Sequence, residues 1–153
     1  MKTPLVFILG VFLASPVLAQ DWSEDNNQGI IEVVGGTAAS GTIIINCADT
    51  GNSVVPIGSL ALYVSPASGR SGTAGDLTFV IGDTSITLPF ADNGGDGFVH
   101  DKNPDSVTKL TALVDALETG DTVVITQGDE ELARIGLEGA GVALAGVEPC
   151  LLP

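Results

Sequence analysis

Short runs of β-branched and aliphatic residues, separated by glycine-rich turns, occupy most of the chain after about residue 29. Alternation of buried-type and polar-type positions is clearest in SLALYVS, where every second residue is Leu or Val, the period of a strand with one face on a core. Gly82-Asp83 between two apolar runs indicates a hairpin. Strands are therefore predicted at Ile30–Val34, Thr42–Cys47, Ser59–Ser65, Leu77–Ile81, Thr84–Phe90, Thr122–Gln127 and Leu132–Ile135.

The hydrophobic period changes to a helical one after Asn103. Pro104 suits the first position of a helix, Asp105 favours the positive end of its dipole, and Gly120 ends it. A second, short helix is predicted at Glu138–Val147, with Pro149 as its stop. The apolar residues at helical spacing in the first helix are Val107, Leu110, Leu113, Val114 and Leu117.

These elements predict one α+β domain at 29–153. Its main part is an antiparallel sheet, curled or sandwich-like, with two helices near the C-terminus. Three segments lack a clear period and are expected to be irregular. Gln20–Gln28 is expected to be a loose acidic lead-in, Pro66–Asp76 an exposed loop, and Ala91–Asn103 a second long loop.

The N-terminus has the organisation of a secretory signal peptide. Lys2 supplies the positive start, Leu5–Ala14 is apolar, and Val17-Leu18-Ala19 suits the positions before a cleavage site. We expect residues 1–19 to be removed after Ala19, which leaves 134 residues. The mature protein is then expected in the periplasm or outside the cell, without integral insertion into a membrane.

Charge excludes some classes of partner. The chain has 19 acidic and 5 basic residues, a net charge of −14, and loss of Lys2 with the signal peptide lowers this to −15. Nucleic acid is excluded, because binding it requires a basic surface, and anionic membranes are disfavoured for the same reason. No motif for an organic cofactor is present, and none is expected.

Cys47 and Cys150 are the only cysteines. An even count in an exported chain favours a disulfide, and two cysteines allow one intramolecular pairing. The alternative is a reactive or metal-binding thiol. No CxxC occurs and no basic residue adjoins either cysteine to lower its pKa, so the structural bond is the favoured interpretation.

The segment LTALVDALETGDTVVITQGDEELARIGLEGAGVALAGVEPC and the earlier TIIINCAD together resemble two groups of exported bacterial proteins. These are the type VI secretion-associated family and the invasion-associated locus B family. The matching positions in the last helix are Leu137, Gly139, Ala143 and Leu144. The resemblance implies a Cys47–Cys150 bond that holds this helix to the early strand, and an accessory role in the cell envelope. It implies no catalytic residues.

Candidate metal ligands gather in the second long loop. Asp92, Asp96 and Asp101 offer hard oxygen atoms near glycine turns, as calcium requires, and His100 could add a nitrogen ligand or act as a base. However, the loop DNGGDG lacks an acid at its third position, and its twelfth position is Asn103. A solvated acidic loop and a surface histidine are therefore the favoured interpretations, and no metal site is assigned.

Candidate hydrolase groups are sparse. Neither Ser40 nor Ser71 lies in a G-x-S-x-G elbow, and the run Asp129–Glu131 reads as a solvated turn. A glycosidase with paired carboxylates would have only Trp22 and Tyr63 as large platforms for a sugar.

Three functional hypotheses follow. The first is an exported, non-enzymatic accessory protein of the envelope that acts through protein–protein contacts, linked to secretion or host interaction. The second is an acidic module that captures a cationic protein or a metal ion. The third is a secreted hydrolase.

Overall fold

The structure is a computed structural model that describes residues 22–48, 58–68, 74–93, 96–100 and 104–151, with the side chains of 92–100 and 104–107 outside that description. The signal peptide prediction at 1–19 and the candidates Asp101 and Ser71 therefore lie outside the described residues. The elements in chain order are β1 (Trp22–Asn27), β2 (Ile30–Thr37), β3 (Gly41–Ala48), β4 (Leu60–Ser65), β5 (Gly75–Ile81), β6 (Thr84–Asn93), β7 (Asp96–His100), α1 (Pro104–Thr119), β8 (Thr122–Gln127), β9 (Glu130–Gly136), α2 (Ala140–Leu144) and the 3₁₀ helix η1 (Ala145–Cys150).

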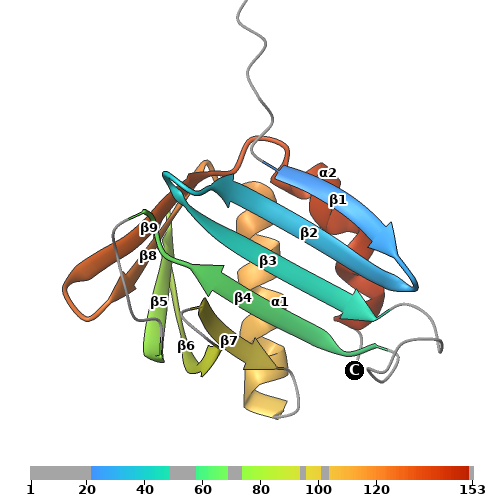
Figure 1. The fold of residues 1–153 in the computed structure, drawn as a ribbon, viewed down its shortest axis with the longest axis horizontal. Helices are drawn as coiled ribbons and strands as arrows, with labels where there is room; N and C mark the ends of the chain where they lie inside the picture. Colours follow the sequence, from blue (N-terminus) through green and yellow to red (C-terminus); the bar gives the residue numbers. More distant parts are fainter. Residues whose placement is uncertain (1–21, 49–57, 69–73, 94–95, 101–103, 152–153) are drawn as a thin grey trace, which may run out of the picture.

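All strand pairs are antiparallel, which confirms the predicted fold class of an α+β domain with a mainly antiparallel sheet and two C-terminal helices. The described strands follow the order β1-β2-β3-β4-β7-β6-β5-β8-β9. Figure 1 shows β1–β4 as a broad layer, with β5, β6, β8 and β9 turned to one side of it. The sheet is therefore strongly curled.

The curl brings β9 next to the turn between β2 and β3. The Arg134 amide donates to the carbonyl of Ser40 (2.9 Å), and the Ala67 amide donates to the carbonyl of Leu132 (2.8 Å). These two bonds join segments from opposite halves of the sheet. They supply partners for backbone groups that would otherwise remain unpaired at this edge.

The helix α1 fills the concave side of the sheet, behind the β1–β4 layer in Figure 1. It packs against β5, β6 and α2. Its apolar stripe is almost fully shielded from solvent, as the helical spacing predicts. The buried residues of this stripe are Leu110, Leu113, Val114 and Leu117.

The prediction of a loose lead-in before residue 29 is wrong for 22–27, which form β1. Gln28 and Gly29 form a two-residue turn with φ values of 53° and 81°, the positive pair that a tight hairpin needs. Trp22 anchors the strand: it is 3% exposed, and its indole Nε1 donates to the carbonyl of Gly136 (2.7 Å). Gly35 lies directly beneath the ring, where a Cβ would meet the indole at 2.5 Å.

Two further boundaries differ from the prediction. The expected loop Ala91–Asn103 instead continues β6 to Asn93 and contains β7, because residues 91–93 pair with residues 96–98. The expected helix Glu138–Val147 begins at Ala140, after Gly139 in the left-handed conformation (φ 87°). It continues from Ala145 as η1, which accommodates Pro149.

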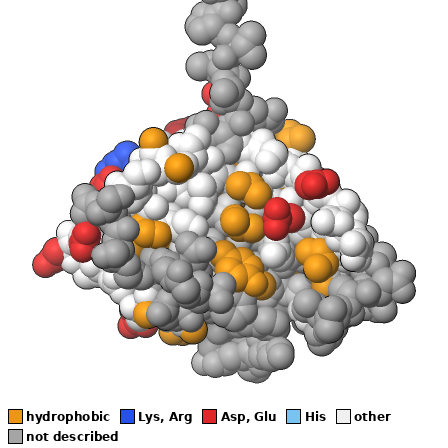
Figure 2. Space-filling view, in the orientation of Figure 1, with side chains coloured by type: hydrophobic (Ala, Val, Ile, Leu, Met, Phe, Trp, Pro, Cys, Tyr) orange, Lys and Arg blue, Asp and Glu red, His pale blue; other side chains and the backbone are white. Residues whose placement is uncertain are grey.

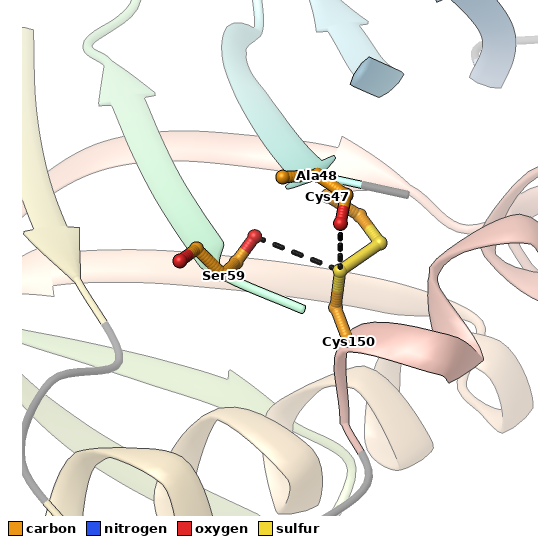
Figure 3. The surroundings of a disulfide bond; sticks show 4 residues. All are labelled: Cys47, Ala48, Ser59 and Cys150. Carbon is orange, nitrogen blue, oxygen red and sulfur yellow. Dashed lines mark hydrogen bonds between the residues drawn. A yellow bond between two sulfur atoms is a disulfide. The ribbon is translucent and has the colours of Figure 1, made fainter. Parts of the chain in front are cut away.

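The disulfide between Cys47 and Cys150 is confirmed (Figure 3), with the two Cα atoms 5.8 Å apart. It joins the end of β3 to the end of η1, and both cysteines are buried. The dashed lines in Figure 3 join Cys150 Sγ to the carbonyl oxygens of Ala48 (3.9 Å) and Ser59 (3.6 Å). Because a disulfide sulfur carries no hydrogen, these are packing contacts against the ends of two strands.

Candidate functional site

The convex face of the β1–β4 layer points away from the core and is the candidate site. Side chains alternate between the two faces of each strand. In β2 and β3 the inward residues Val33, Ile43 and Ile45 are at most 1% exposed. The residues between them, such as Val34 and Ile44, point outward and are half-buried.

An apolar row crosses the middle of this outer face. The strand register places Ser23 opposite Val34, Val34 opposite Ile44, and Ile44 opposite Tyr63. Figure 2 shows hydrophobic side chains gathered over this part of the sheet. An outward face of an antiparallel sheet is commonly polar, so three large apolar side chains in line form a surface of unusual composition. We call Val34, Ile44 and Tyr63 the apolar row.

A polar row lies beside it, two residues along each strand. Asp25 is opposite Glu32, and Glu32 is opposite Asn46. Two residues of a strand span about 7 Å, which sets the spacing between the rows. Both carboxylates are exposed, and acidic side chains lie next to hydrophobic ones in Figure 2. We call Asp25, Glu32 and Asn46 the polar row.

The polar row borders a shallow cleft of about 160 Å³, lined by Asp25, Asn27, Ile30, Glu32 and Asn46. Asn46 Oδ1 is shielded from solvent and accepts no hydrogen bond. A buried acceptor without a donor costs about 1–3 kcal/mol. The cleft therefore combines two carboxylates with a buried amide oxygen that has no hydrogen-bond partner.

No positive charge from the described residues compensates the polar row. The structure describes the side chains of two basic residues, and both have partners elsewhere. Lys109 donates to the carbonyl of Thr87 (3.1 Å), and Arg134 forms an ion pair with Glu131 (2.7 Å). Asp25 and Glu32 therefore lie directly opposite each other on neighbouring strands, with no compensating cation among the described side chains.

A second cleft, of about 270 Å³, follows the contact between β9 and the β2–β3 turn, and Ser40 and Arg134 are among its lining residues. Ser40 Oγ lies 2.9 Å from the Thr37 amide, which donates to it, and 3.1 Å from the Gly41 carbonyl. The hydroxyl thus stabilises the turn. The register places His100 opposite Ala61, which is itself opposite Asn46 on β3. Ser40 lies six residues before Asn46, a separation of roughly 20 Å along the strand. The structure does not bring the two hydrolase candidates together.

A third cleft, of about 430 Å³, lies between the end of α1 and the β5–β6 turn. Its polar lining is mainly threonine hydroxyls, together with Asp121. Thr119 Oγ1 already donates to the carbonyl of Asp115 (2.9 Å), which completes the last turn of the helix. This cleft brings together no acid–base pair of the kind that catalysis requires.

The structure gives backbone positions for three of the candidate metal ligands. Asp92 is in β6, and Asp96 and His100 are in β7, so they belong to a paired hairpin. Within the residues whose side chains are described, no three His, Cys, Asp or Glu side chains gather as metal ligands would. Among the described helices, none has both the length and the apolar character needed to cross a bilayer.

The two proposed aromatic platforms have different environments. Trp22 is buried between Gly35 and the end of β9 and offers no surface to a sugar. Tyr63 is half-buried on the outer face, in the apolar row. At the candidate site, Tyr63 therefore lies beside the aliphatic side chains of the apolar row.

Sequence reasoning did not identify this surface, although a signal for it exists. IIEVV and TIIIN have large apolar residues at both odd and even positions, a pattern that indicates a strand covered on both faces. Only the register shows that Val34, Ile44 and Tyr63 align.

A family model described as YfjT matches residues 20–144. The match gives membership of a family, and nothing in it connects the chain to type VI secretion or to invasion-associated locus B. Searches of curated proteins and of solved structures find no significant match.

Proposed function

The chain belongs to the YfjT family, and on that premise we propose that it is an exported accessory protein of the cell envelope that acts through protein–protein contacts. The outer face of the β1–β4 layer is the contact surface. The observation that carries this proposal is the apolar row, in which Val34, Ile44 and Tyr63 align across three strands on the side away from the core. Aligned apolar side chains on a regular sheet are suited to a partner that covers them.

Export is supported by two features. The family match begins at residue 20, directly after the expected cleavage site at Ala19. The buried Cys47–Cys150 bond suits the periplasm or the exterior, where disulfides persist. A role linked to secretion or host interaction is the finer form of the proposal, and it rests on the resemblance in the Cys47 strand and the last helix.

The alternative function is electrostatic capture of a cationic protein or a metal ion. It is favoured by the polar row, where Asp25 and Glu32 lie opposite each other. The two functions differ in salt dependence: contact between apolar surfaces survives high salt, whereas capture by charge is lost.

The test uses the full chain expressed in a bacterium whose genome encodes the same protein. A photo-crosslinking residue replaces Ile44, and a control replaces Ser85, an exposed position on the outer side of β6. We expect a mature N-terminus at Gln20 in the osmotic-shock fraction, and one discrete crosslinked product from position 44 that is absent from position 85. Retention of residues 1–19 in the cytoplasm, or equal crosslinking from both positions, would contradict the proposal.

A further inference from the structure

We propose that the partner surface is basic beside an apolar centre: a cationic side chain, arginine or lysine, enters the cleft of the polar row while apolar side chains cover the apolar row. This inference rests on the proposed function and names the chemistry of the partner. The occupant is a protein segment with alternating apolar and cationic residues.

The first step is the uncompensated charge. Asp25 and Glu32 lie opposite each other on β1 and β2, line one cleft and are both exposed. A guanidinium carries five N–H donors and an ammonium three, so either can bond both carboxylates. Charge-assisted bonds of this kind are stronger than neutral ones.

The second step is the spacing of the two rows. Glu32 and Val34 are two residues apart on β2, as Asn46 and Ile44 are on β3, which separates the rows by about 7 Å. An extended peptide also places residues two apart on one face at this spacing. A Leu-x-Arg pattern in a partner strand therefore matches both rows at once.

The third step distinguishes a protein from a metal ion. Ile30 supplies an apolar wall to the cleft on one side of Glu32, and Val34 of the apolar row lies on the other side of Glu32 along β2. A bound ion would contact the polar row alone, whereas a protein segment also contacts Val34 and Ile44. A cationic side chain on a protein segment accounts for both rows.

The experiment uses the purified mature protein, labelled with ¹⁵N, and a synthetic peptide of repeated Leu-Ser-Arg-Ser. We expect saturable amide shifts at residues of both rows, on β1–β4, and none on β5. Replacing every arginine of the peptide by glutamine removes these shifts, and so does grouping the arginines at one end. Addition of salt weakens the binding without changing its location.

Two variants test the two rows separately. Asp25→Asn with Glu32→Gln should weaken peptide binding at least about tenfold, since the charge-assisted hydrogen bonds from the arginine to both carboxylates are lost. Ile44→Thr should weaken binding without changing its salt dependence. The matched control, Asp76→Asn with Asp83→Asn, removes the same charge from exposed positions on the other part of the sheet and should bind normally.

Three results would overturn the inference. They are shifts spread over all acidic surfaces, binding unaffected by the Asp25/Glu32 variant, and a calcium-selective, saturable shift of the polar row that magnesium does not reproduce. The proposed function fails separately. If crosslinking from position 44 persists in cells while the Asp25/Glu32 variant binds normally, only the cationic chemistry of the partner is wrong.

Discussion

Glu118 is the second-to-last residue of α1, and its backbone carbonyl lies close to Gly141 of α2. Burial raises the pKa of this carboxyl above its ordinary value of 4.5, and the negative charges of Asp115 and Glu148 raise it further. The folded state therefore binds the proton more tightly than the unfolded chain. The resulting stabilisation is complete below pH 4.5 and is lost as the pH rises through the raised pKa. At neutral pH the ionised Glu118 opposes folding.

Replacing Glu118 with Gln should increase the free energy of unfolding at pH 7 by less than about 1 kcal/mol, because solvent screens part of the repulsion. At pH 3, where the wild-type carboxyl is protonated, the two proteins should be nearly equal in stability. Denaturant titration at both pH values measures this difference. The control Asp76→Asn, at an exposed position, should show no such gain. A gain of equal size at pH 3 would show that the effect is not electrostatic.

At the scale of elements, β1 depends on one side chain. Its other residues are exposed, and only Trp22 reaches the core, where it packs over Gly35 and bonds the carbonyl of Gly136. That contact joins the first strand to the end of β9. The same indole therefore holds together two segments more than a hundred residues apart in sequence.

Trp22→Ala should destabilise the protein by about 3–5 kcal/mol, the usual cost of removing a buried large aromatic side chain. Trp22→Phe keeps the ring but leaves the Gly136 carbonyl unpaired, so a smaller loss of about 1–3 kcal/mol is expected. Hydrogen exchange should show loss of protection in β1 and at the end of β9 before the rest of the sheet. Uniform loss of protection would mean that Trp22 has no special role at this junction.

The elements with a clear period could be predicted from the sequence, and β1 and β7 could not. WSEDNN has no apolar alternation, because every residue of β1 after Trp22 is exposed to solvent. The segment around DNGGDG looks like a loop because its turn residues dominate the pattern, although the strands continue on both sides. A polar edge strand and a glycine-rich hairpin both depend on pairing with distant strands, which local sequence does not contain.

At the scale of the whole molecule, the disulfide could be predicted and the candidate interaction surface could not. Two cysteines allow one intramolecular pairing, whatever the fold. The two rows together require the register of four strands, β1–β4, and that register follows from turns of different lengths. A two-residue turn joins β1 to β2, whereas the connection from β3 to β4 spans residues 49–59. The sequence alone shows apolar residues at outward positions and does not show which of them become neighbours.

The disulfide closes a loop with a sequence separation of 103 residues, so most of the domain lies between its ends. On the chain-entropy account, a loop of this length contributes up to about 4.7 kcal/mol, and removal of such bonds commonly costs about 2–5 kcal/mol. The α2–η1 segment is the part that depends on it most. It is short, contains Gly141 and Gly146, and would be unstable as an isolated helix. Reduction should therefore loosen the C-terminal segment first.

Reduced wild-type protein and the double variant Cys47→Ser/Cys150→Ser should both melt at a temperature several degrees lower than the oxidised protein. Hydrogen exchange should find the amides of Ala140–Cys150 exposed while β2–β4 stay protected, because those strands keep their own partners in the sheet. Agreement between the reduced and the substituted protein is the control, since the two remove the bond by different chemistry. An unchanged melting curve in both would mean that packing of α2 against α1 and β1 holds the C-terminal segment without the bond.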